Sequence, residues 1–179
     1  MDADFKVFWL FGRSGAGKTT LAQRLHQTLR EEPLPVVCLD GDNLRSTVCS
    51  DLGFQPEARW ENHRRIAEIA GLLSRQQVRV IVATMAPEYA DREVVARILG
   101  DRLVWFYIHA PLEVCMRRDP KGIYQRARTG QLKLLIDYPF DDPRAREGEN
   151  RIDTTRENVD ECHQAILKVV RAHLGRPTA

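Results

Sequence analysis

The sequence predicts an α/β fold in which helices cover both faces of a parallel sheet. Short apolar runs alternate with amphipathic helical patterns, and the crossovers between such runs make neighbouring strands parallel. The 179 residues and an apolar share of 43% suit an ordinary globular domain. Because no repeat, low-complexity tract or composition break interrupts the chain, we expect one domain over residues 1–179.

Four continuous apolar runs are typical of buried strands, and they cover residues 6–11, 35–40, 78–84 and 102–108. In a parallel sheet, ligands bind beyond the carboxyl ends of the strands. The residues that follow positions 11, 40 and 84 should therefore surround one crevice.

Helical periodicity predicts three long helices between and after these strands. The first covers 17–32 and carries one leucine stripe, formed by Leu21, Leu25 and Leu29. The second covers 57–76, with an apolar stripe of Ile66, Ile69, Ala70 and Leu73. The third covers 154–174, where Thr154 and Glu157 have the spacing of a capping box.

Charge and cysteine content exclude several classes of protein. The 27 basic residues nearly balance the 25 acidic ones, which argues against a nucleic-acid partner. No stretch approaches the length of a membrane span, and the acidic start MDADFK is unlike a signal peptide. Four cysteines without metal-ligand spacing suggest reduced thiols, so we expect a cytoplasmic protein.

The segment FGRSGAGKTT, residues 11–20, contains the pattern G-x-x-x-x-G-K-T. Glycines let backbone N–H groups converge on phosphate, Lys18 reaches the β- and γ-phosphates, and the Thr19 hydroxyl holds Mg²⁺. A strand before the pattern and a helix after it favour this interpretation over a glycine turn without a ligand. The predicted ATP contacts are Gly12, Ser14, Gly15, Ala16, Gly17, Lys18, Thr19 and Thr20.

The second strand ends in LDGDNLR, residues 39–45, with Asp40 and Asp42 on either side of a glycine. Asp42 could accept the proton of an acceptor hydroxyl or hold Mg²⁺ through water, and Asp40 could support either role. The same letters also suit a simple turn with a helix N-cap. Spacing alone leaves the two interpretations open.

Five motifs in order resemble the adenylylsulfate kinase family: GRSGAGKTT, LDGDNLR, DLGF (51–54), ENHRRIAE (61–68) and RDPKGIYQRAR (118–128). The resemblance runs from about residue 6 to about residue 170. It implies a three-layer α/β/α P-loop fold of the nucleotide-kinase type. It also implies transfer of the γ-phosphate of MgATP to the ribose 3′-hydroxyl of adenylylsulfate, a homodimer, and a possible sulfurylase partner.

The resemblance assigns roles to individual residues. It makes Lys18, Asp40 and Asp42 catalytic, and it places Arg118 and Lys121 in a lid over ATP at about 117–145. Without the other motifs, residues 117–133 would be interpreted as a solvated basic helix. The residues implied for the acceptor nucleotide are Asp42, Arg45, Phe54, Arg59, Asn62 and Met85.

The chain departs from the family pattern at several positions. Ala86 in TMAP (84–87) replaces a serine that has been proposed as a phosphorylated intermediate, so transfer should be direct. In KLLIDYPF (133–140), Lys133, Leu134 and Leu135 stand where a lid phenylalanine would clamp the acceptor base. STVC (46–49) is also altered, and His63 replaces an isoleucine.

These departures leave alternatives open. One is a kinase on the same scaffold with a different acceptor, such as a CDP-linked phosphoramidate or a related nucleotide. Another is a non-catalytic nucleotide-binding regulator, which is disfavoured because Lys18, Thr19 and Asp42 are all retained.

Overall fold

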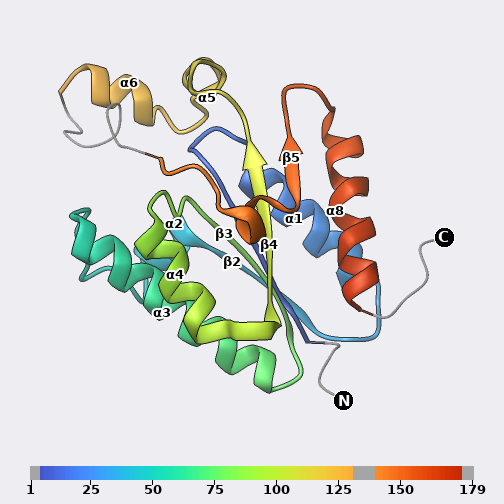
Figure 1. The fold of residues 1–179 in the computed structure, drawn as a ribbon. Helices are drawn as coiled ribbons and strands as arrows, with labels where there is room; N and C mark the ends of the chain where they lie inside the picture. The colour runs from blue at the N-terminus through green and yellow to red at the C-terminus, as the bar shows by residue number, and fades with distance from the viewer. Residues whose placement is uncertain (1–4, 131–139, 175–179) are drawn as a thin grey trace.

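A computed structural model describes residues 5–130 and 140–174 and confirms the predicted α/β architecture. In this part of the chain, five strands form one sheet in the order β2-β3-β1-β4-β5 (Figure 1), and every pairing is parallel. The strands are β1 (Val7–Phe11), β2 (Val36–Asp40), β3 (Arg79–Thr84), β4 (Leu103–His109) and β5 (Arg151–Asp153).

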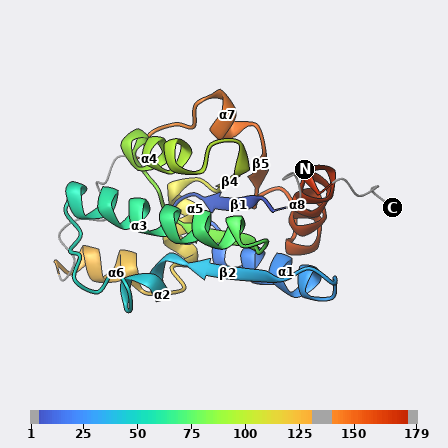
Figure 2. The same cartoon turned by 90° about the horizontal axis from the view of Figure 1, so that it is seen from below.

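Helices cover both faces of the sheet (Figure 2). Alternate residues of β1 point to opposite faces, as the period of a strand requires. Phe8 and Leu10 pack with α1 (Lys18–Arg30) and α8 (Val159–His173), whereas Trp9 belongs to the core formed with α3 (Pro56–Arg75) and α4 (Tyr89–Leu99). Both cores are apolar, which explains why the sequence of β1 is an unbroken apolar run.

Shorter helices lie between the strands. Helix α2 (Gly41–Arg45) follows β2, α5 (Leu112–Arg118) and α6 (Ile123–Arg128) follow β4, and α7 (Ala145–Gly148) precedes β5, while a 3₁₀ turn (Gly100–Arg102) precedes β4. Residues of α2, α5 and α6 line the crevice. Within the described residues, none of the helices has the length and apolar character needed to cross a bilayer.

The sequence placed the start of the last helix incorrectly. Helix α8 begins at Val159, and its capping box joins Asn158 to Glu161 rather than Thr154 to Glu157. The Asn158 side chain accepts from the backbone N–H of Glu161 at 3.0 Å, and the Glu161 carboxylate accepts from the N–H of Asn158 at 2.9 Å. The Thr154 hydroxyl instead makes tertiary contacts: it donates to the Ala16 carbonyl at 3.0 Å and accepts from the Arg118 guanidinium at 2.9 Å.

Candidate functional site

A cavity of about 730 Å³ opens at the carboxyl edge of the sheet. It brings together most of the residues predicted from the sequence: Ser14, Gly15, Gly17, Lys18, Thr19, Thr20, Asp40, Asp42, Arg45, Phe54, Arg59, Asn62, Met85, Arg118 and Lys121. Gly12 and Ala16 belong to the same loop but do not line the cavity. Lys133, Leu134 and Leu135 lie outside the described residues, so their role stays a prediction.

The glycine loop folds where side chains would not fit. A Cβ at Gly12 would overlap the carbonyl oxygen of Ile108, and one at Gly15 would lie 2.8 Å from the carbonyl oxygen of Cys115. Gly15 also has a φ of +80°, a conformation that costs other residues energy. The loop therefore passes close to β4 and α5 just before α1 begins. Its residues Gly15 and Gly17 line the cavity.

Lys18, the first residue of α1, is half-buried beside this loop. Its Nζ donates to the Arg13 carbonyl at 2.7 Å. Burial, together with the nearby charge of Lys121, lowers the pKa of Lys18 to about 8. An anion in front of the loop would offset this cost, because an opposite charge favours the protonated amine.

The two aspartates of the β2–α2 turn have different surroundings. Asp40 caps α2: its carboxylate accepts from the backbone N–H of Asp42 at 2.9 Å and from the Thr19 hydroxyl at 2.9 Å. The Asp42 side chain is 64% exposed and pairs with Lys121. The turn-and-cap interpretation therefore applies to Asp40, while Asp42 remains accessible from the cavity.

The oxygen atoms of Thr19 and Asp40 suit a hard divalent cation. Mg²⁺ usually binds through one or two protein oxygens and takes its other ligands from water and phosphate. Among the residues that the structure describes, no group of three or more His, Cys, Asp or Glu side chains could hold a metal without such help. This arrangement fits Mg²⁺ arriving with a nucleotide.

Two contacts attach the predicted lid to the glycine loop and to the chain before α8. The Arg118 guanidinium donates to the Thr154 hydroxyl at 2.9 Å and to its carbonyl at 2.8 Å. The Tyr124 hydroxyl donates to the Ser14 carbonyl at 2.9 Å, and Tyr124 is buried. The described part of 117–133 is thus two short packed helices rather than one solvated basic helix.

The opposite wall of the cavity carries the residues predicted for the acceptor. The Arg45 guanidinium lies 4.8 Å from the centre of the Phe54 ring, which is 54% exposed. The Arg59 Nε donates to the Phe54 carbonyl at 2.8 Å. Asn62 is buried, and its Oδ1 has no hydrogen-bond partner in the described chain. This wall can therefore offer two guanidinium groups, an aromatic face and an amide.

A buried arginine connects the chain after β3 with the segment that follows the lid. Arg92 donates to the carbonyls of Ala86 (2.9 Å), Pro87 (3.0 Å) and Asp141 (3.1 Å), and its Nε donates to Glu147 at 2.8 Å. Ala86 has a φ of +40°, so this guanidinium fixes a backbone conformation that alanine rarely adopts.

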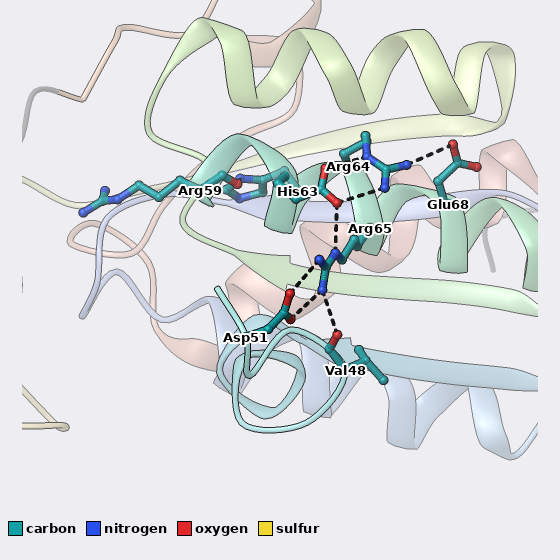
Figure 3. Close-up of polar contacts among 8 residues, drawn as sticks. Val48, Asp51, Arg59, His63, Arg64, Arg65 and Glu68 are labelled. Atoms are coloured by element: carbon teal, nitrogen blue, oxygen red, sulfur yellow. Dashed lines mark hydrogen bonds and ion pairs between the residues drawn. The ribbon is translucent and has the colours of Figure 1, made fainter. Parts of the chain in front are cut away.

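A polar network on α3 holds the loop that carries Phe54 (Figure 3). The Arg65 guanidinium makes two hydrogen bonds with Asp51, at 2.6 and 2.8 Å, and a third with Glu61 at 2.9 Å. Arg64 also donates to Glu61, and these hydrogen bonds lower the pKa of Glu61 to about 2. Only Arg65 of the two arginines reaches across to the loop.

Arg65→Ala should therefore raise the KM for the acceptor about three- to tenfold, since a charge-assisted pair contributes roughly 1 kcal/mol at a half-exposed site. The KM for ATP should change less, because the contact between Arg65 and Asp51 does not involve the glycine loop. Arg64→Ala is the matched control, because it removes a neighbouring guanidinium without a contact to Asp51. Equal acceptor KM values in the two variants would contradict a role for the contact between Arg65 and Asp51.

Some of the cavity lining was not predicted from the sequence. Thr154, Glu157 and Val159 reach the cavity from the start of α8, and Pro87 reaches it from the chain after β3. The sequence indicates only a helix cap at Thr154 and Glu157 and, in TMAP, only the departure at Ala86, so the topology rather than a motif brings these residues to the site.

The chain is similar throughout to proteins of one family. A family model described as adenylylsulphate kinase matches residues 4–149. An adenylyl-sulfate kinase of Paraburkholderia xenovorans is 44% identical over 170 residues, which cover 94% of this chain and 92% of the relative. The structure of the Mycobacterium tuberculosis APS kinase CysC in complex with AMPPNP and APS superposes with a TM-score of 0.88 at 32% identity, covering 94% and 98% of the two chains. The bifunctional enzyme NodQ of Azospirillum brasilense is 39% identical over 92% of this chain and 27% of its own length.

Proposed function

Since the chain belongs to the adenylylsulfate kinase family, we propose that it transfers the γ-phosphate of ATP to the ribose 3′-hydroxyl of adenylylsulfate. The observation that carries this proposal is one cavity with the glycine loop on one wall and the acceptor residues on the other. Asp42, in the first turn of α2, lines the same cavity. Phosphoryl transfer requires mainly such positioning, together with neutralisation of charge.

On the donor side, the backbone of the glycine loop and Lys18 would hold the β- and γ-phosphates. Arg118 would cover the nucleotide from the lid. Mg²⁺, when bound at the Thr19 and Asp40 oxygens, would neutralise charge on the phosphate oxygens. The 2.9 Å contact between these two side chains supports this position for the ion.

On the acceptor side, Asp42 would accept the proton of the 3′-hydroxyl as the oxygen attacks the γ-phosphorus. Lys121 now contacts Asp42, and the phosphates of ATP would compete for the same ammonium group. Arg45, Arg59 and Asn62 would hold the acidic group, while Phe54 would stack on the base. Met85, Lys133, Leu134 and Leu135 remain predictions for the rest of the acceptor pocket. Ala86 offers no hydroxyl, which supports direct transfer.

A coupled assay of ADP release tests the proposal on adenylylsulfate, on CDP-linked nucleotides and on other nucleotides in parallel. We expect turnover with adenylylsulfate and formation of 3′-phosphoadenylylsulfate, identified by mass spectrometry. Turnover only with another nucleotide would instead support the alternative acceptor. ATP binding without turnover on any acceptor would support a regulator.

We also propose that the protein is a cytoplasmic homodimer. The similarity to a segment of a bifunctional enzyme supports association with a second enzyme, for which a sulfurylase that makes the acceptor is our candidate. Light scattering at micromolar concentration tests the dimer, and a mass of 20.5 kDa in solution would refute it.

A further inference from the structure

The face of α3 that turns toward the sheet changes from polar to apolar along its length. Arg59, Asn62, His63 and Ile66 have the spacing i, i+3, i+4 and i+7, so they lie on one face of the helix. Ile66 is in the apolar core, whereas the other three residues line the cavity. His63 is therefore the last polar residue before the core begins.

The two nitrogens of His63 have different surroundings. Nδ1 lies 2.8 Å from the Arg59 carbonyl and 3.3 Å from the Asp91 carboxylate. Both partners are acceptors, so Nδ1 carries a hydrogen. Nε2 has no hydrogen-bond partner among the described residues, although His63 is only 4% exposed. His63 lines the cavity, and its Nε2 is not among the fully buried atoms without a partner, so this nitrogen is accessible to a ligand there.

The charged groups around His63 come from three helices and one cap. Arg59 and Glu57 lie on α3, Arg45 lies on α2, Asp91 lies on α4, and Glu88 caps α4. Burial raises the pKa of Asp91, but the hydrogen bond and charge of His63 outweigh this effect, and the pKa is lowered. Asp91 is thus an ionised carboxylate that accepts from the Nδ1–H of His63.

The chemistry of the neighbours identifies the ligand group. Arg45 and Arg59 line the same cavity as His63, and their two guanidinium groups form a site for an anion. An anion there would offset the repulsion between the two arginines. In such a complex the ring would carry a hydrogen on both nitrogens, so that Nε2 is also a donor.

We propose that His63 is a further acceptor-binding residue, which donates a hydrogen bond from Nε2 to the acidic group of the acceptor nucleotide. Asp91 and the Arg59 carbonyl are positioning groups, because both contact Nδ1 and so orient the ring. The inference rests on the proposed function for the identity of the acceptor. It adds a donor at a position where the family resemblance predicts isoleucine, which cannot make this bond.

Two amide substitutions separate the roles of the ring nitrogens. The amide nitrogen of His63→Gln lies near the position of Nε2, whereas that of His63→Asn lies near the position of Nδ1. We expect His63→Asn to raise the KM for adenylylsulfate about 10- to 100-fold, the range for a hydrogen bond to a charged group. His63→Gln should recover most of this loss, and the KM for ATP should stay within about twofold in both variants. Equal acceptor KM values for the two variants, or a matching loss in ATP KM, would overturn the proposal.

The test also distinguishes failure of this inference from failure of the proposed function. If the wild-type enzyme turns over only another acidic nucleotide, the same variants are compared on that acceptor. If no acceptor turns over, calorimetric binding of adenylylsulfate to the wild type, His63→Gln and His63→Asn replaces KM. Binding that is weakened equally by both variants, or by neither, would overturn the role of His63.

Discussion

Asp42→Asn is expected to lower kcat by about 10²- to 10⁴-fold, the usual contribution of a general base, with ATP affinity within a few-fold of the wild type. The amide has the shape of the carboxylate but cannot take the proton of the acceptor hydroxyl. Since the Asp42 side chain is 64% exposed, the substitution should leave folding intact. ADP release gives kcat, and calorimetry with a non-hydrolysable ATP analogue gives the affinity.

Asp101→Asn provides the matched control. Asp101 is exposed and lies in the 3₁₀ turn before β4, so it is at the opposite edge of the sheet from the cavity. The same chemical change there should leave kcat unaltered. If Asp42→Asn behaved like Asp101→Asn, the assignment of Asp42 as the base would be refuted.

Arg92→Met should reduce the free energy of unfolding by about 3–5 kcal/mol, the range measured when one partner of a buried ion pair is removed. Methionine fills a similar volume but leaves Glu147 buried without its cation. It also removes the donors from the Ala86, Pro87 and Asp141 carbonyls. Urea unfolding at pH 7, followed by circular dichroism, measures the change.

Two variants control for this loss. Arg24 forms an ion pair with Asp160, but both side chains are largely exposed, so Arg24→Met should cost less than about 1 kcal/mol. Combining Arg92→Met with Glu147→Leu removes both charges and should recover part of the stability. A loss below about 1 kcal/mol for Arg92→Met alone would show that the buried pair is not needed for the fold.

The four longer strands and the helices α1 and α3 could be predicted because their signals are local, whereas α4 was not predicted. The unbroken apolar run of β1 and the leucine stripe of α1 require only their own residues. Strand β5 was missed because its three residues contain a single buried position, Ile152, and so show no period. The start of α8 was wrong because two capping boxes fit the sequence, and Thr154 makes tertiary contacts with Ala16 and Arg118 that the sequence does not show.

The candidate site likewise contains residues that could be predicted from the sequence and residues that could not. Lys18, Thr19 and the aspartate turn could be found because motif spacing reflects backbone geometry within a few residues. Arg45 and Asn62 required the family resemblance, since nothing in their own segments indicates an anion. Arg92 could not be predicted, because its partners after β3 and after the lid are brought to it only by the folded chain.

The contacts of Arg92 have a mechanical consequence. Because one guanidinium donates to both Pro87, which lines the cavity, and Asp141, near the end of the predicted lid, we expect these two segments to move together. An acceptor too bulky for the cavity near Pro87 should then displace the predicted lid as well.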